Sequence, residues 1–242
     1  IFQLGYGEGN VVTYIPPNLR DKWAEVVKHI IMHYNEGWAN GYSYNITYWE
    51  VWNEPDFIGW WKGTPREFCA LYETVARKIK DYNPNLKVGG PAASYPNSEF
   101  VRTFLSYCRD EKVPLDFFSW HSYSKNPYQN YVKAVEAQNL LDTYGFNKTP
   151  SFVTEWNTYS GTPPELYPPD FRYDLGGPTG GAAYATSSLI YFQNSTVSVA
   201  AFYRGDAHPW GLFHMEYGSW TKQAYAFKAF RALLETPNRL RM

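Results

Sequence analysis

The chain has 242 residues, of which 44% are hydrophobic and 19% are charged, so it can bury a sizeable core and is neither disordered nor membrane-spanning. Its formal net charge is −1 and it has no basic run, which argues against nucleic acid and anionic lipid as partners. Aromatic residues make up 19% of the chain, which fits either a large aromatic core or flat faces that bind apolar ring substrates or sugars.

Strand-like and helix-like segments take turns along the whole sequence, which we read as one large domain, 1–242. The clearest helix start is Thr64-Pro65-Arg66-Glu67, which combines an N-cap, a proline at the first helical position and a capping-box glutamate. In chain order we expect a strand at 1–6, a helix at 19–34, a strand at 48–54, a helix from 64, a strand at 86–92, a helix at 99–109, a strand at 115–123, a helix at 131–144, a strand at 151–156, a helix at 181–193, a strand at 197–203 and a helix at 222–234.

This alternation predicts an α/β fold with a parallel sheet covered by helices, either an open doubly wound sheet or a (β/α)8 TIM barrel. No glycine-rich phosphate-binding motif begins any of the expected helices. This argues against nucleotide binding and favours the barrel over the doubly wound sheet. The two cysteines, Cys69 and Cys108, lie in helical segments and predict neither a disulfide framework nor a metal site.

Two glutamates stand at predicted strand ends, where the chemistry of a (β/α) barrel is located. Glu54 closes "EVWNE" and Glu155 closes "FVTE", and each is flanked by a tryptophan, Trp52 or Trp156. Either glutamate alone could be paired with an Arg or Lys of a neighbouring strand. Two carboxylates across an aromatic cleft are instead the groups that hydrolyse a glycosidic bond.

Asn53 lies beside Glu54 and could hydrogen-bond a sugar hydroxyl. Side chains alternate between the faces of a strand, so Asn53 and Glu54 reach the same cleft only if the strand end turns or bulges. The long loop Ser160–Gly181, which is rich in Pro and Gly and follows Glu155, either shapes the substrate entrance or is a plain surface excursion.

The sequence contains, in this order, the segments "WEVWNEPD", "KVGGPA", "WHSYS" and "FVTEWNT". With them the chain resembles the retaining glycoside hydrolases of clan A, and most closely family 39, the β-xylosidase and α-L-iduronidase family. The likeness extends from about Tyr14 to the final helix. It implies a TIM barrel, a carbohydrate substrate, and chemistry that needs no metal or other cofactor.

The resemblance also implies roles for individual residues. Glu54 would be the general acid/base at the end of the fourth barrel strand, and Glu155 the nucleophile at the end of the seventh. Asn53 would bind the 2-hydroxyl of the sugar, while His121 and Tyr123 would line the same subsite, with Tyr123 bonding to Glu155. Without the resemblance, His121 and Tyr123 are equally well explained as core residues.

Three aromatic residues complete the predicted substrate-binding set. Trp156 is expected to line the cleft beside Glu155. Tyr203 stands about where β-xylosidases carry a tryptophan platform, which leaves the identity of the sugar open, and Trp210 could replace that platform from the following loop.

If Glu54 ends the fourth strand, residues 1–6 are at most the third, so the chain would contain strands three to eight and lack strands one and two. An open barrel exposes parallel strand edges and apolar surface. We therefore expect a longer protein, of which the opening residue Ile1 is a sign, or a second polypeptide, or a homo-oligomer that covers the open edge.

The sequence thus predicts a retaining glycoside hydrolase for β-xylosides or a related pentoside or uronide. The alternatives are an α-L-iduronidase-like or other clan A glycosidase, and a carbohydrate-binding barrel fragment without turnover.

Overall fold

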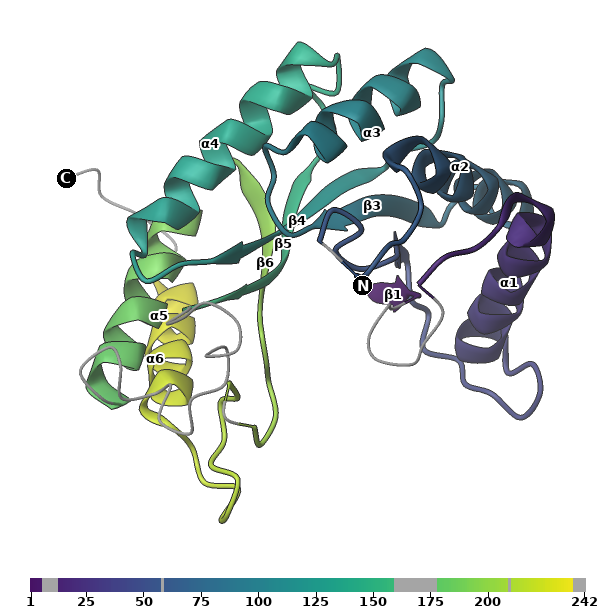
Figure 1. The fold of residues 1–242 in the computed structure, drawn as a ribbon. Coiled ribbons are helices and arrows are strands. Elements are labelled where there is room, and N and C mark those ends of the chain that lie inside the picture. The colour runs from purple at the N-terminus through teal and green to yellow at the C-terminus, as the bar shows by residue number, and fades with distance from the viewer. Residues whose placement is uncertain (6–12, 58, 159–177, 209, 237–242) are drawn as a thin grey trace. The chain divides into compact units, whose positions relative to one another are not determined.

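The computed structural model describes residues 1–5, 13–57, 59–158, 178–208 and 210–236, and these contain six strands and six α-helices (Figure 1). The strands are β1 (Phe2–Leu4), β2 (Tyr48–Val51), β3 (Lys87–Ala93), β4 (Phe117–Tyr123), β5 (Ser151–Asn157) and β6 (Val197–Phe202). The helices are α1 (Arg20–Glu36), α2 (Pro65–Tyr82), α3 (Glu99–Asp110), α4 (Tyr128–Thr143), α5 (Pro178–Gln193) and α6 (Lys222–Arg231), with short 3-10 turns at Pro17–Leu19 and Ala232–Glu235.

Every expected element is present, and most bounds agree within three residues. The capping box of α2 is confirmed, since Thr64 Oγ1 accepts the Glu67 N–H at 3.2 Å and the Glu67 carboxylate accepts the Thr64 N–H at 2.8 Å. Most of the loop Ser160–Gly181 lies outside the described residues.

The strand order decides between the two predicted architectures. The six strands lie in the sheet in the order β1-β2-β3-β4-β5-β6, and the pairs from β1 to β4 are parallel. A doubly wound sheet reverses its strand order at a switch point, whereas a barrel keeps chain order. The chain therefore has a partial (β/α)8 barrel fold, and six of the eight strands of a complete barrel are among the described residues.

The chain divides into two compact units whose boundary runs through β4 and β5. The first unit comprises Ile1–His121 and Val135–Thr154, and the second comprises Ser122–Ala134 and Glu155–Met242. The two predicted catalytic glutamates consequently belong to different units, Glu54 to the first and Glu155 to the second.

The first unit has a core of large aromatic side chains between its strands and helices. The fully buried members include Trp49 of β2, Phe117 of β4, and Phe68 and Tyr72 of α2. In α2 the buried residues recur at helical spacing, which gives the helix one apolar face toward the sheet.

The second unit is organised around Trp156 of β5. Its ring lies 5.4 Å from Phe192 of α5, 5.0 Å from Phe202 of β6 and 5.9 Å from Phe227 of α6, measured between centroids. Helix α6 begins at an N-cap, Thr221, whose side chain accepts the Ala224 N–H. Many of the aromatic residues therefore pack in the cores of the two units. None of the described helices combines the length and the hydropathy that crossing a bilayer requires.

Candidate active site

Glu54 lies on a turn that follows β2. The strand ends at Val51, and Trp52 and Glu54 then adopt left-handed backbone conformations with φ of +72° and +42°. The Glu54 N–H donates to the Ala92 carbonyl at 2.9 Å, which ties the turn to β3. Such conformations cost on the order of 1 kcal/mol or more for a non-glycine residue and are concentrated at functional sites. The turn that Asn53 and Glu54 were predicted to need is therefore present.

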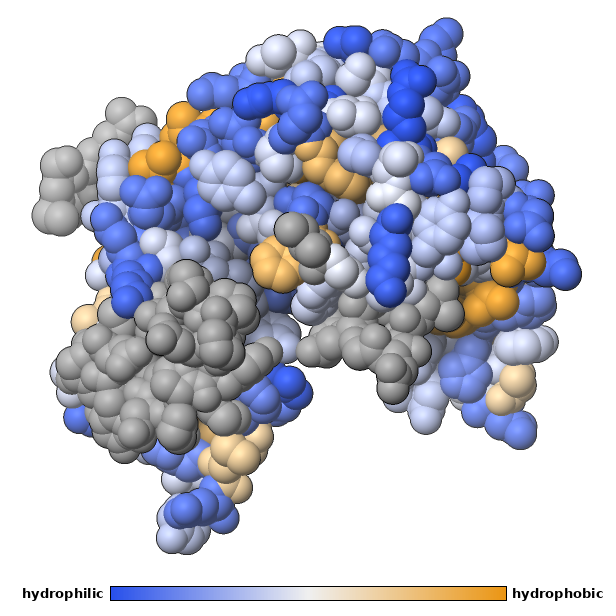
Figure 2. Space-filling model, viewed as in Figure 1, coloured by the Kyte–Doolittle hydropathy of each residue, from blue (hydrophilic) through white to orange (hydrophobic). Residues whose placement is uncertain are grey.

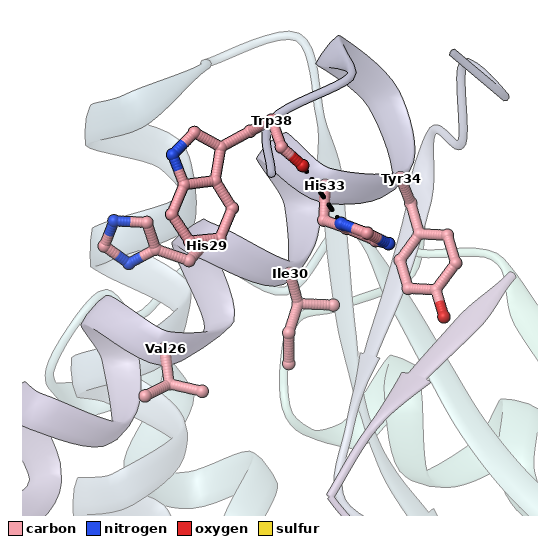
Figure 3. Close-up of a pocket in the computed structure, with 6 residues that line it drawn as sticks. All are labelled: Val26, His29, Ile30, His33, Tyr34 and Trp38. Carbon is pink, nitrogen blue, oxygen red and sulfur yellow. Dashed lines mark hydrogen bonds between the residues drawn. The ribbon is translucent and has the colours of Figure 1, made fainter. Parts of the chain in front are cut away.

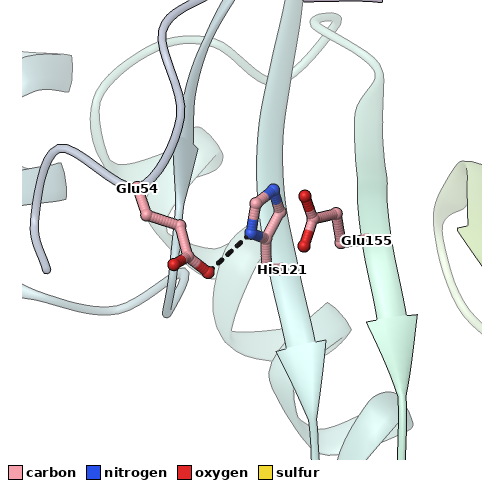
Figure 4. A group of neighbouring side chains, drawn as sticks. All are labelled: Glu54, His121 and Glu155. Atoms are coloured by element: carbon pink, nitrogen blue, oxygen red, sulfur yellow. Dashed lines mark hydrogen bonds and ion pairs between the residues drawn. The ribbon is translucent and has the colours of Figure 1, made fainter. Parts of the chain in front are cut away.

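His121 is the hydrogen-bonding partner of Glu54 (Figure 4). Its Nδ1 lies 2.8 Å from Glu54 Oε1, and the imidazole is fully buried while the carboxylate is 14% exposed. When Glu54 is ionised, Nδ1 must carry the hydrogen, because a carboxylate can only accept. The sequence predicted that His121 lies in the site, but not that it bonds to the acid/base candidate.

Asp56 is a third carboxylate on the same turn, and sequence reasoning missed its role. Its two oxygens accept the N–H and the hydroxyl of Ser94 at 2.8 and 2.9 Å. Burial raises the pKa of Asp56, the bonds from Ser94 lower it, and the charge of Glu54 raises it. Asp56 therefore fastens the turn that carries Glu54 to the segment after β3. The signal for it was its position directly after "WNEP".

Asn53 is buried, and its Oδ1 accepts a hydrogen bond from Gln3 Nε2 at 2.7 Å. This bond sets the orientation of the amide, because Oδ1 faces β1 and the NH2 group points away from Gln3. An NH2 group held in this way is suited to donate to a hydroxyl, as the prediction for Asn53 requires.

In the second unit, Tyr123 is the partner of Glu155. The Tyr123 hydroxyl donates to Glu155 Oε2 at 2.6 Å, so the expected bond is present. Figure 4 also draws Glu155 on β5. This bond engages Oε2, one of the two oxygens of the Glu155 carboxylate.

The rings of Tyr203 and Trp210 surround Tyr123. Their centroids lie 6.4 and 5.6 Å from that of Tyr123, both edge to face, and 6.2 Å from each other. Trp210 thus reaches from the loop after β6 into the aromatic cluster beside Tyr123.

Asn157, two residues after Glu155, holds this cluster in place and was not predicted. Its side-chain NH2 donates to the carbonyl oxygens of Tyr203 and, at 3.2 Å, of Trp210. The Tyr203 N–H donates to the Trp156 carbonyl at 3.0 Å. A buried amide bonded to both aromatic residues fixes their backbone relative to β5.

Trp156 does not occupy the position expected of a sugar-contacting ring. Its side chain is fully buried among the rings of α5, β6 and α6. Side chains alternate along a strand, so Trp156 points to the face opposite Glu155 and packs under the helices. We therefore leave Trp156 out of the proposed sugar contacts.

The sequence model described as Glycosyl hydrolases family 39 matches residues 6–174. The chain belongs to this family. Among curated relatives, a β-xylosidase from Geobacillus stearothermophilus is 32% identical in an alignment of 174 residues that covers 63% of this chain and 33% of the relative. A β-xylosidase from Caldicellulosiruptor saccharolyticus is 29% identical in an alignment of 205 residues that covers 76% of this chain and 37% of the relative.

Solved structures of glycosidases have the same fold. A glucosidase from Croceicoccus marinus superposes with a TM-score of 0.78 at 32% identity, over 92% of this chain and 48% of that one. A family 39 β-xylosidase from Caulobacter crescentus superposes with a TM-score of 0.72 at 23% identity, over 91% and 49%. This family 39 chain thus spans about a third of the length of its curated relatives and about half of these structures.

Proposed function

We propose that the chain carries the catalytic residues of a retaining glycosidase, with Glu54 as general acid/base and Glu155 as nucleophile. The observation that carries the proposal is that each glutamate, in a chain of family 39, lies near the carboxyl end of a barrel strand and has a hydrogen-bonding partner. The carboxyl ends of barrel strands form the catalytic face of this fold. The proposal assigns both carboxylates to the hydrolysis of one glycosidic bond.

In the first step, Glu155 attacks the anomeric carbon while the bond from that carbon to the leaving oxygen breaks. Glu54 gives its proton to the leaving oxygen. In the second step, Glu54 takes a proton from water, the water oxygen attacks the anomeric carbon, and Glu155 is released as a carboxylate. The sum is hydrolysis with retained configuration, and no metal or redox partner enters it.

The partners fit this division of labour. The Tyr123 hydroxyl donates to Oε2 of Glu155, which orients this carboxylate for attack. His121 bonds Oε1 of Glu54, which leaves Oε2 to handle the proton. Asn53 would donate to the 2-hydroxyl of the sugar, and Tyr203 and Trp210 would form the aromatic wall of the subsite.

For the substrate we propose β-D-xylosides, because two relatives are named β-xylosidases. β-Glucosides are a second candidate, favoured by the equally high identity to the Croceicoccus glucosidase. A uronide of the α-L-iduronide type is a third, since Tyr203 differs from the tryptophan expected in β-xylosidases. Initial rates with the 4-nitrophenyl β-xyloside, β-glucoside and α-L-iduronide rank the three.

The stereochemistry tests the mechanism. Proton NMR of the first sugar released should show the anomer with the configuration of the substrate, and an ordered structure should place the two carboxyl groups about 5 to 5.5 Å apart. Release of the inverted anomer would contradict the proposal. Binding of xylobiose by a folded sample with no release of any sugar would instead support a carbohydrate-binding fragment.

A further inference from the structure

The connection from α1 to β2, residues 37–47, is aromatic and contains no charged residue (Figure 1). Its aromatic side chains are largely open to solvent, since Trp38 is 46% exposed, Tyr42 47% and Tyr44 61%. Its other polar side chains are amides and hydroxyls. Large rings that gather on the surface mark a binding site more often than a single exposed residue does.

The two tyrosines of this connection stack with Tyr34 of α1, and the three rings are called the tyrosine stack below. The Tyr42 ring lies 4.7 Å from that of Tyr44 and 5.8 Å from that of Tyr34, with 12° between the planes in both pairs. Tyr34 and Tyr44 are only 6.3 Å apart, so the nearly parallel rings overlap like steps rather than forming a straight column. Because Tyr44 is 61% exposed and has Tyr42 on one side, its other face is open to a ligand.

Hydrogen bonds hold the tyrosine stack in place. The N–H groups of Tyr42 and Tyr44 donate to carbonyl oxygens in the last turn of α1, at 2.6 and 2.9 Å. The side chain of Asn35 donates to the Ile46 carbonyl at 2.8 Å and accepts the Ile46 N–H at 2.7 Å. Asn45 has φ of +55°, a conformation that persists only where the surrounding structure imposes it. A surface fixed in this way loses little conformational freedom when a ligand binds.

A polar acceptor lies beside these ring faces. The His33 ring meets Tyr34 and Tyr42 edge to face, at 5.0 and 5.5 Å between centroids. Its Nδ1 lies 3.0 Å from the Trp38 carbonyl oxygen and must carry the hydrogen, so Nε2 of the neutral ring is an acceptor. Hydrophobic side chains gather over α1 at the right of Figure 2. There a groove of about 520 Å³ adjoins the stack, lined by Val26, His29, Ile30, His33, Tyr34 and Trp38 (Figure 3).

The tyrosine stack is separate from the candidate active site. It lies before the amino end of β2, whereas Glu54 follows the carboxyl end of the same strand. In a (β/α) barrel the catalytic groups stand at the carboxyl ends of the strands. A ligand on the stack is therefore remote from the reacting bond.

We propose that the tyrosine stack is a second carbohydrate-binding site, which takes a neutral β-linked glycan chain by stacking a pyranose ring on the open face of Tyr44. A pyranose has a face of C–H groups and a rim of hydroxyls, and these match an aromatic face beside an imidazole and amides. A connection without charge offers nothing to the phosphates of a nucleic acid. The choice of a glycan among neutral ligands rests on membership of family 39 and on the proposed function.

Affinity electrophoresis tests the proposal without depending on turnover. Native gels contain soluble xylan or, separately, hydroxyethylcellulose, and retardation of the chain measures binding. Tyr42→Ala/Tyr44→Ala removes the exposed rings, and Tyr42→Phe/Tyr44→Phe keeps them. Tyr225→Ala, at a tyrosine of α6 that is 57% exposed, is the matched control. Circular dichroism checks the folding of each chain, and Tyr44→Ala alone replaces the double alanine variant if that variant does not fold.

We expect polysaccharide to retard the wild type, the phenylalanine variant and Tyr225→Ala alike. The alanine variant should need about tenfold more polysaccharide for the same retardation, as is usual when an aromatic anchor is truncated. Retardation by xylan alone or by the cellulose derivative alone would identify the glycan. Hydroxyl-radical labelling of Tyr44 should fall when xylohexaose is added.

Equal retardation of the wild type and the alanine variant, or no retardation by either polysaccharide, would overturn the proposal. So would sedimentation that shows a dimer of the wild type which the alanine variant does not form, because the rings would then bind a second copy. Release of nitrophenol from 4-nitrophenyl β-xyloside, measured in parallel, should be the same for all these chains. Retardation that depends on the rings in chains that hydrolyse no glycoside would support this inference and contradict the proposed function.

Discussion

Glu54 in the first unit lies on a turn outside the regular strand, whereas Glu155 in the second unit lies within β5. Glu54 bonds a buried imidazole, and Glu155 accepts a hydrogen bond from a tyrosine hydroxyl. An acid/base has to exchange a proton twice in each cycle, and a titratable partner can follow that change. A nucleophile has to stay ionised, and a tyrosine hydroxyl, which keeps its proton near neutral pH, can donate a hydrogen bond to it throughout the cycle. The two surroundings therefore suit two roles.

Removing the proposed proton donor should give a large effect, second only to loss of the proposed nucleophile. We expect Glu54→Gln to lower kcat/KM for an alkyl xyloside by about 10²- to 10⁴-fold, the usual contribution of general acid catalysis. With an activated leaving group such as dinitrophenol, which departs without a proton, formation of the glycosyl-enzyme should be nearly normal. Glu111→Gln, at an exposed site of the same unit, is the control. An equal loss with both substrates would assign the acid elsewhere.

The hydroxyl beside Glu155 should matter next. Tyr123→Phe keeps the ring among Tyr203 and Trp210 but removes the donor to Oε2. A hydrogen bond to a charged group contributes about 1.5 to 3 kcal/mol, so kcat/KM should fall roughly 10- to 100-fold. Steady-state kinetics beside Tyr217→Phe, a tyrosine that is 82% exposed, measures this. Unchanged kinetics would mean that the bond does not act in the reaction.

The close approach of β3 to β4 makes a prediction about stability in the first unit. A Cβ on Gly89 would lie 2.3 Å from the Phe117 carbonyl oxygen. Gly89→Ala should therefore lower the free energy of unfolding by about 1 to 3 kcal/mol, the usual cost of overpacking. Urea denaturation compares it with Gly205→Ala, where no atom lies within 4 Å of the added Cβ. Equal midpoints for the two variants would refute the close packing.

The smallest effect concerns Asp56. Burial raises its pKa, so the folded state holds this proton more tightly than the unfolded state does. The resulting stabilisation is complete below the unfolded pKa and is lost as pH rises through the folded pKa. Asp56→Asn cannot titrate, so wild type should lose stability relative to the variant from acidic to neutral pH. Urea midpoints at several pH values test the sign, and the opposite trend would contradict the assignment.

The repeat of strand and helix could be predicted because the elements carry local signals, such as the capping box at Thr64. The bond from Tyr123 to Glu155 followed from the family resemblance. The partners of Glu54 and Asp56 could not be predicted, since His121 and Ser94 are distant in sequence. Trp156 was misjudged because the sequence showed its neighbour Glu155 but not the aromatic rings of the helices on the other face.

The most direct test of the two roles is chemical rescue of alanine variants with azide, assayed on dinitrophenyl β-D-xyloside, with Glu216→Ala at an exposed position as the control. Glu155→Ala should lose turnover by about 10⁴-fold or more and regain it as a glycosyl azide of inverted configuration. Glu54→Ala should give an azide of retained configuration, because the covalent intermediate still forms. An inverted azide from Glu54→Ala, or no rescue of Glu155→Ala in a preparation whose wild type is active, would contradict the assignment of nucleophile and acid/base.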